Sequence, residues 1–195
     1  MSDPVEVLDF WLGEVGPEGW YAGGEALDAD CRARFADLWV AAHDGGLEHW
    51  VDGTVGTLAY LVICDQLARN IHRGGAQAFA TDARALAAAK RAVEAGWDMG
   101  APEPERQFFY MPFEHSENPE DQATAVQLLT ERLSSDPEMA LHARAHQAII
   151  ARFGRFPFRN AALGRETTPD EADFLASGGY AAEVARQRAS HAAGA

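Results

Sequence analysis

The sequence DPEMALHARAHQAIIARFG, residues 136–154, contains the signals of one complete helix. Asp136 is a residue type that caps helices, and Pro137 suits the first helical position because that position needs no backbone N–H donor. Gly154 follows the apolar residue Phe153, and glycine commonly closes a helix in the left-handed conformation. The stretch therefore predicts a helix over residues 137–153.

The same signals recur along the whole chain. Further helix starts are predicted at Asp3-Pro4, Glu103-Pro104, Asn118-Pro119 and Thr168-Pro169. An acid at the third helical position resembles a capping box after three of the capping residues, with Glu6, Asp121 and Glu171 in that position. Helix ends are predicted at Gly13, Gly45-Gly46 and Gly96. The predicted helices cover residues 4–12, 25–44, 55–72, 82–95, 104–111, 119–134, 137–153 and 169–177.

The predicted class is all-α, since no segment shows the sustained period-two alternation of a strand. Short connections favour antiparallel helical hairpins, arranged as a bundle or as a short solenoid. We expect a single helical domain over residues 1–195, with its core at about 4–177. The stretch over 178–195 is rich in alanine and polar residues, so it is predicted to fray or to form a loose last helix.

The composition excludes several classes of partner. With 30 acidic and 16 basic residues the net charge is -14, which disfavours nucleic acid and membrane surfaces as partners. The longest stretch without charged residues or histidine, Gly53 to Cys64, is too short to span a bilayer. The first residues carry acids and a proline rather than a signal sequence, so a cytoplasmic protein is expected. Cys31 and Cys64 have no metal-ligand spacing and are predicted to be buried thiols.

A first polar motif lies in the predicted helix over residues 55–72 and just beyond it. Its members are Asp65, Gln66, Arg69, Asn70 and Arg73. On a helical wheel they fall within an arc of roughly 140°, which upstream is apolar, so they are predicted to point inward. Asp65 and Arg69 are four residues apart and can pair. The motif is either a ligand site or a structural network that fixes the helix register.

A second motif, RFGRFPFRN over residues 152–160, reverses the charge of this acidic chain. Arg155, Arg159 and Asn160 are predicted to lie in a loop, and arginine suits bidentate recognition of carboxylate or phosphate. The phenylalanines between them are expected to anchor the core or to stack on the arginines.

Histidines and carboxylates supply the candidates for acid–base chemistry. His115 and Glu117 precede the helix predicted to start at Pro119, although capping explains most of the acids around them. His142 and His146 are predicted to line a core face, and His146 could bridge to an acid or an arginine. No ligand spacing matches a defined metal site, and no glycine-rich phosphate loop or nucleophile elbow is present, so no metal and no cofactor are expected.

The chain resembles a bacterial family of unknown function, number 924, from about Val5 to Leu175. The resemblance rests on the segments 7–13, 65–66 with 69–70, 78–82, 115–117 with 121–122, and 152–160. It implies an all-helical, tetratricopeptide-like fold and no established reaction. The chain departs from the family pattern at Leu67-Ala68, where Phe-Pro is usual, and at Phe158, where histidine is usual, so histidine chemistry is not expected at position 158.

These observations lead to two hypotheses of function. In the first, the motifs converge on one polar pocket that binds a small anionic molecule. Arg69, Arg73, Arg155 and Arg159 would hold the anion, Asp65, Gln66, Asn70 and Asn160 would orient them, and His115 or Glu117 would act as acid or base. In the second, stacked helices bind a protein or peptide partner and the arginines are structural.

Overall fold

The computed structural model describes residues 3–194, and this described part of the chain is all-α without any strand. It divides into two compact units, the first ending at Pro112 and the second beginning at Phe113. Two such units can belong to one domain. The single domain expected over 1–195 therefore stays a prediction, and residues 1, 2 and 195 lie outside the described part. The tetratricopeptide-like arrangement also stays a prediction. No helix within residues 3–194 has the length and apolarity needed to cross a membrane.

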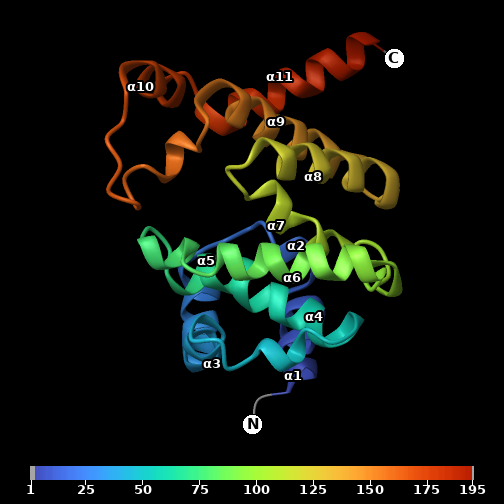
Figure 1. Cartoon of the computed structure of the whole chain (residues 1–195). Helices are drawn as coiled ribbons and strands as arrows, with labels where there is room; N and C mark the ends of the chain where they lie inside the picture. The colour runs from blue at the N-terminus through green and yellow to red at the C-terminus, as the bar shows by residue number, and fades with distance from the viewer. Residues whose placement is uncertain (1–2, 195) are drawn as a thin grey trace. The chain divides into compact units, whose positions relative to one another are not determined.

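Unit 1 is built from helices of mixed type (Figure 1). Its α-helices are α1 (Pro4–Leu8), α2 (Gly16–Gly19), α3 (Glu25–His43), α4 (Thr54–Leu61), α5 (Ala68–Ile71) and α6 (Asp82–Ala95), and α7 (Met111–Glu114) contains the boundary with unit 2. The 3₁₀ helices are η2 (Glu48–Trp50), η4 (Ala76–Phe79), η5 (Asp98–Gly100) and η6 (Glu105–Phe109), and the π-helices are η1 (Asp9–Val15) and η3 (Val62–Leu67).

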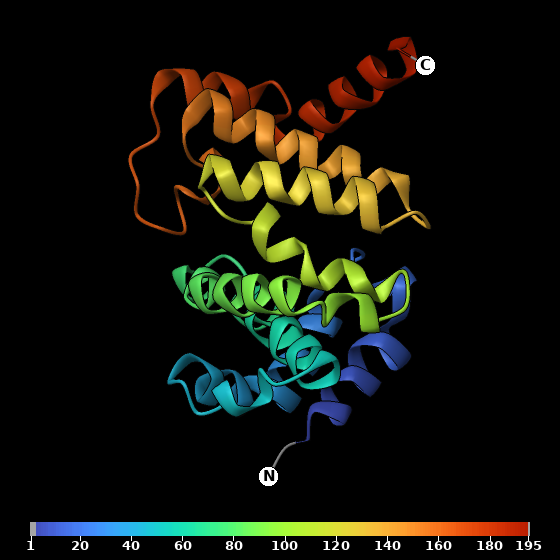
Figure 2. The ribbon, with the colours of Figure 1, turned by 45° about the vertical axis from the view of Figure 1, so that its right-hand side comes forward.

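The core of unit 1 forms around the chain segment from α4 to α5. Helix α3 packs against α5 and η3, α1 packs against α4, and α6 lies against α4 on another side (Figure 2). Large side chains fill the space between these helices, among them Trp11, Phe35, Tyr60, Leu61, Ile63, Leu67, Phe108 and Phe109. Burial of this apolar surface is what holds the short helices together, since helices of this length are unstable alone.

The helix predicted over residues 55–72 is interrupted by the π-helix η3. The backbone N–H of Ala68 donates to the carbonyl of Ile63, five residues earlier. Two carbonyl oxygens of the segment accept side-chain donors, because Thr81 Oγ1 donates to Cys64 O at 2.6 Å and Arg69 Nη1 donates to Asp65 O at 2.5 Å. A π turn inside a helix often marks a functional position.

Unit 2 is a helical hairpin with two further helices. It contains α8 (Pro119–Arg132), α9 (Pro137–Phe153), the 3₁₀ helix η7 (Pro157–Arg159), α10 (Pro169–Ala176) and α11 (Gly179–Gly194). Helices α8 and α9 pack side by side after a short connection, α11 packs on α9, and α10 contacts η7 and α11. A core cluster contains Ile149, Ile150, Phe156 and Phe174, with Phe153 and Tyr180 against it.

Most helix boundaries follow the predicted signals. Asp3, Asn118, Asp136 and Thr168 each cap a helix through the side chain, as predicted. Among the described helices, only the one starting after Thr168 has the reciprocal capping box, formed with Glu171. Gly96 and Gly154 close their helices in the left-handed conformation, with φ of 73° and 68°.

Two boundary predictions were wrong. Gly13 does not end the first helix, because the π-helix continues to Val15 and is followed by Gly16, which has a positive φ of 64°. The segment predicted as one helix over 104–111 is the 3₁₀ helix η6 followed by α7. The stretch over 178–195, predicted to fray or to form a loose last helix, contains the helix α11 as far as Gly194, with Val184 buried.

Candidate functional site

Arg69 lies between two carboxylates in unit 1. Its Nη2 is 3.2 Å from Oδ1 of Asp65, and its Nη1 is 3.1 Å from Oδ1 of Asp82. Asp65 is only 1 % exposed, and Gln66 Nε2 donates to its Oδ2 at 2.5 Å. The buried charge of Asp65 is thus compensated by a cation and an amide, which is the condition for burying a carboxylate.

Asn70 and Arg73 meet a different carboxylate, Asp28 of α3. Arg73 binds it through two nitrogens, with Nε 2.5 Å from Oδ2 and Nη2 2.7 Å from Oδ1, and Asn70 Nδ2 donates to Oδ1 at 2.9 Å. The hydrogen bond from Arg73 lowers the pKa of Asp28 below its ordinary value. The first motif therefore divides into two networks, one around Asp65 and one around Asp28, and the second network joins the end of α5 to α3.

In unit 2, Arg155 and Asn160 share the carboxylate of Glu171. Arg155 Nε lies 2.6 Å from Oε1 and its Nη2 2.8 Å from Oε2, while Asn160 Nδ2 is 3.2 Å from Oε2. Glu171 also accepts from the backbone N–H of Thr168 at 2.8 Å. Mainly through the bond from Arg155, the pKa of Glu171 falls to about 2. This network fixes the loop after α9 to the start of α10.

Glu117 is engaged in the same loop. Arg165 approaches its carboxylate with Nη1 at 2.8 Å and Nη2 at 3.0 Å, and the backbone N–H of Phe156 donates to Oε1 at 2.8 Å. Burial acts to raise the pKa of Glu117, but the bonds from Arg165 and Phe156 outweigh it and the pKa is lowered. Glu117 thus stays ionised and holds the loop; a role in proton transfer stays a prediction.

A buried acid and a buried histidine, Glu114 and His146, are in direct contact in unit 2. His146 Nδ1 lies 2.5 Å from Glu114 Oε1, and the two residues are 9 % and 2 % exposed. Burial lowers the pKa of His146, although Glu114 opposes this. Burial acts in the opposite sense on Glu114, but the attraction of His146 prevails and the pKa of the carboxyl is lowered. Both shifts favour a neutral imidazole beside an ionised carboxylate.

Aromatic rings surround this pair. Tyr180 stacks on the His146 ring with a centroid distance of 4.6 Å, and its hydroxyl lies 2.6 Å from His142 Nδ1. Phe156 lies edge-on to His146 at 5.2 Å, and His115 at 6.1 Å. The members of what we call the His146 cluster are Glu114, His115, His142, His146, Phe156, Phe158, Arg159 and Tyr180.

Arg159 and Phe158 complete the cluster through Phe156. The guanidinium of Arg159 lies 4.6 Å above the Phe156 ring, and Phe158 stacks on the same ring at 5.2 Å. Arg159 is 6 % exposed, whereas Phe158 is 43 % exposed. Phe158 therefore supplies an aromatic surface at the position where the resemblance leads one to expect histidine.

The Glu114–His146 pair has the arrangement of an oriented base. A neutral histidine whose Nδ1–H donates to a carboxylate carries its lone pair on Nε2, where it can accept a proton. The second carboxylate oxygen, Glu114 Oε2, is buried and has no hydrogen-bond partner among the described residues. The pair can therefore hold and exchange a proton within a buried surrounding of aromatic rings, two further histidines and Arg159.

Sequence reasoning found part of this cluster. It expected His146 to line a core face and to be able to bridge to an acid, and the structure shows such a bridge. Among the acids before the helix that starts at Pro119 it favoured Glu117 rather than Glu114, and it did not point to Tyr180. The signal for Glu114 was its place directly before His115, while Tyr180 lay in a stretch predicted to be loose. The predicted convergence of the two arginine motifs stays a prediction, because one motif lies in unit 1 and the other in unit 2.

Comparisons with known proteins find a matching family and a similar solved structure, and both are of unknown function. The family described as "Bacterial protein of unknown function (DUF924)" matches residues 7–179. A solved structure of a protein of unknown function from Agrobacterium tumefaciens is 38 % identical, with a TM-score of 0.82, and the match covers 88 % of this chain and 96 % of that one. Among curated proteins, none has significant sequence similarity to the chain.

Proposed function

The chain belongs to this bacterial family of unknown function. We propose that its unit 2 binds a small anionic molecule beside His146, and that His146 accepts a proton from this molecule and returns it. The observation that carries the proposal is the contact of 2.5 Å between His146 Nδ1 and the buried Glu114. A carboxylate in this position fixes the imidazole ring and its tautomer, which is the role of the orienting acid in acid–base sites.

The protonation states support a base rather than a permanent ion pair. Because burial lowers the pKa of His146, the ring is neutral near pH 7 and Nε2 is available to accept a proton. Glu114 would stabilise the imidazolium formed when the proton arrives. His115, whose ring centroid is 6.1 Å from that of His146, is a second imidazole beside it and would relay or return the proton.

Arg159 is the residue proposed to attract the anion. The chain carries a net charge of -14, so an anion is repelled by the protein as a whole and needs a local positive group. Arg159 and His146 both contact the Phe156 ring, with the guanidinium 4.6 Å and the imidazole centroid 5.2 Å from the ring centroid, and the charge of Arg159 adds to the lowering of the His146 pKa that burial causes. A carboxylate or phosphate bound by the guanidinium would therefore lie close to the imidazole.

The proposal is tested by exposing the purified protein to a bacterial metabolite extract and following anionic compounds by mass spectrometry. We expect the wild type to convert at least one anionic compound, and His146→Gln to slow that conversion by about 100-fold or more, the usual contribution of general acid–base catalysis. Glu114→Gln should reduce the rate as well, since a neutral amide no longer stabilises the imidazolium.

The matched control is His43→Gln. His43 also has a carboxylate partner, with Nδ1 2.9 Å from Asp44 Oδ1, but that pair is exposed and lies in unit 1. This variant should convert the compound at the wild-type rate. The proposal is wrong if no anionic compound changes, or if conversion persists in a folded His146→Gln protein.

A second candidate function is a module that binds a protein or peptide. It is favoured by the ion pairs that three of the arginines make. Arg69, Arg73 and Arg155 each contact a carboxylate of their own unit, as expected for structural arginines. If this candidate is correct, phosphate and dicarboxylates will leave the melting temperature of the wild type unchanged, and Arg155→Ala will lower the melting temperature. If an anionic ligand raises the melting temperature of the wild type but not that of Arg155→Ala, Arg155 instead binds the anion.

A further inference from the structure

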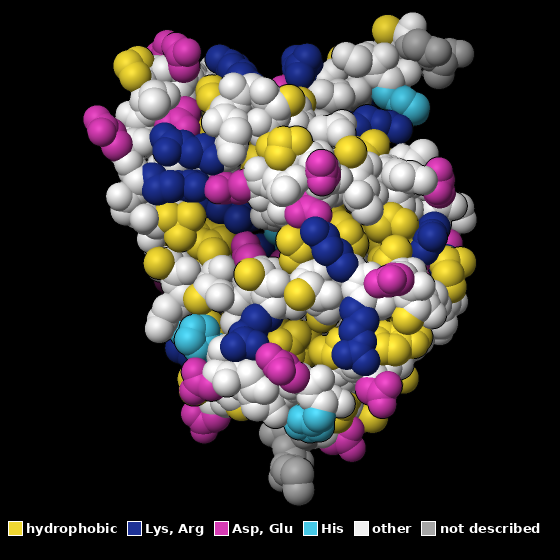
Figure 3. Space-filling model, in the orientation of Figure 1, with side chains coloured by type: hydrophobic (Ala, Val, Ile, Leu, Met, Phe, Trp, Pro, Cys, Tyr) yellow, Lys and Arg dark blue, Asp and Glu magenta, His cyan; other side chains and the backbone are white. Residues whose placement is uncertain are grey.

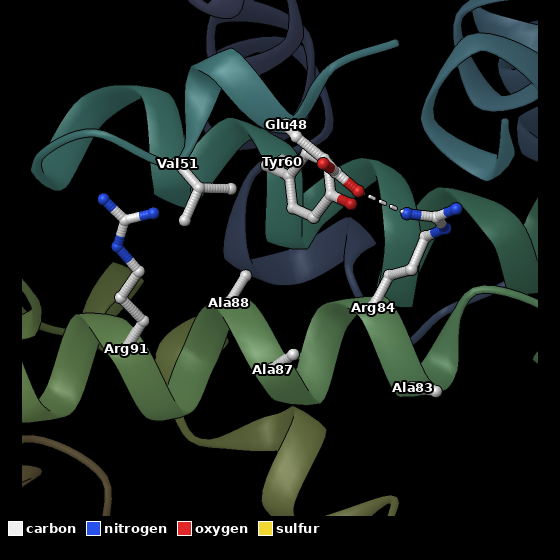
Figure 4. A pocket seen from close by; sticks show the side chains of 8 residues that line it. All are labelled: Glu48, Val51, Tyr60, Ala83, Arg84, Ala87, Ala88 and Arg91. Carbon is white, nitrogen blue, oxygen red and sulfur yellow. Dashed lines mark hydrogen bonds and ion pairs between the residues drawn. The ribbon is translucent and has the colours of Figure 1, made fainter. Parts of the chain in front are cut away.

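A cavity of about 360 Å³ opens in unit 1 between α6 and the segment from η2 to α4. Figure 4 shows the residues that line it, which are Glu48, Val51, Tyr60, Ala83, Arg84, Ala87, Ala88 and Arg91. Its volume lies within the range of small-molecule sites, at the lower end. None of these residues belongs to the motifs or the cluster described above.

Small side chains on α6 create the cavity. Ala87 and Ala88 occupy the part of the helix between Arg84 and Arg91, so the surface there is low and apolar, as Figure 4 shows. Val51 and Tyr60 face it from the opposite wall. Tyr60 is 2 % exposed and is therefore held rigidly by the core. The middle of the cavity is an apolar slot with one aromatic wall.

The two ends of the slot are basic but differ in their partners. Arg84 Nη1 lies 2.6 Å from Glu48 Oε1, so the charge at this end is largely compensated. Arg91 contacts the Trp97 ring, 5.3 Å from its centroid, and makes no ion pair with a carboxylate among the described residues. Trp97 orients the guanidinium without neutralising it. Arg91 is thus a pre-oriented cation at an apolar surface.

The lining carries a net positive charge within an acidic chain. Two arginines and one glutamate line the cavity, whereas the protein has a net charge of -14. Figure 3 shows this face of unit 1, on which basic side chains border a hydrophobic area, with an acidic side chain beside one of them. One excess positive charge matches a monoanion, since a second negative charge on the ligand would meet Glu48.

We infer that this cavity is a binding site for a small monocarboxylate with an apolar, preferably aromatic, body. The carboxylate binds the guanidinium of Arg91, and the body lies over Ala87 and Ala88 against Val51 and Tyr60. Binding combines a charge-assisted hydrogen bond with burial of the apolar body. The inference is independent of the function proposed above, because every lining residue lies in unit 1.

The test is an NMR titration of the full ¹⁵N-labelled chain with phenylacetate, and with phenylacetamide as its neutral counterpart. We expect saturable shifts confined to residues 48–60 and 83–97 with phenylacetate, and much weaker ones with the amide. Arg91→Ala should weaken phenylacetate binding about tenfold or more, the value of a hydrogen bond to a charged group. Ala87→Leu should abolish phenylacetate binding, because the larger side chain fills the slot while the charges stay unchanged.

Lys90→Ala is the matched control, since it removes one positive charge from the neighbouring position of the same helix but does not line the cavity. Its affinity for phenylacetate should equal that of the wild type. The inference fails if no saturable shift occurs, if the amide binds as well as the acid, or if Lys90→Ala weakens binding as much as Arg91→Ala. An equal affinity of Ala87→Leu would also overturn it.

Discussion

Acidification below pH 6.5 should destabilise unit 2 through His146. Burial lowers the pKa of His146 in the folded protein below its ordinary value of 6.5, so the unfolded chain takes up the proton first as the pH falls. The stabilising contribution is therefore complete above pH 6.5 and is lost as the pH falls toward the lower pKa of the folded protein.

The linkage relation sets the size of this effect. A single group that protonates only in the unfolded chain changes the free energy of unfolding by at most about 1.4 kcal/mol per pH unit. Between pH 7 and 5.5 the loss is therefore at most about 1.3 kcal/mol, the value reached when His146 stays neutral in the folded state throughout this interval. Glu114 does not contribute in this interval, because its pKa is lowered from an ordinary value of 4.5.

The assay is urea unfolding at several pH values, followed through the NMR signals of α9 so that unit 2 is observed directly. Wild type and His146→Gln are compared, because the contributions of groups that do not contact His146, such as His72 with its own lowered pKa, cancel in the difference. The wild-type curve should fall more steeply between pH 7 and 5.5. Parallel curves for the two proteins would refute the account of His146 as a buried neutral base.

Three further predictions concern stability, and urea or thermal unfolding measures each. Phe156→Ala should cost about 3–5 kcal/mol, since Phe156 is 0 % exposed, whereas Phe158→Ala at 43 % exposure should cost far less; similar losses would contradict the packing described. Thr168→Ala removes a capping box and should cost about 1 kcal/mol, and an unchanged stability would show that the box contributes nothing. Gly56→Ala should destabilise unit 1 strongly, because its Cβ would lie 2.3 Å from the carbonyl oxygen of Trp50; a neutral effect would mean that the backbone shifts freely there.

The sequence predicted the helical class and most boundaries because the signals there are local. A capping residue followed by proline, as at Asp136, satisfies the same unpaired backbone donors in any fold. The errors occur where tertiary contacts decide. Nothing local distinguishes a π turn at residues 62–67 from an α-helix, and the packing of α11 on α9 cannot be read from the composition of α11.

The candidate site was less predictable than the fold for the same reason. Sequence spacing suggested a pair between Asp65 and Arg69 within one helix, and the structure has it. It could not reveal that Arg73 would meet Asp28, 45 residues away, or that Glu114 would meet His146, 32 residues away. Such pairs depend on which helices become neighbours, and that is decided by burial of the whole unit.

The π-helix at Val62–Leu67 also changes how relatives should be aligned. A turn that closes on the fifth residue contains one residue more than an α turn, so it is equivalent to an insertion in a regular helix. Every side chain after it, including those of Arg69 and Asn70, is thereby turned by about 100° from the direction that an uninterrupted helix would give. A relative lacking one residue in this segment would present the same arginine and asparagine to a different neighbour. A one-residue gap here therefore signals a changed network even where both residue types are kept.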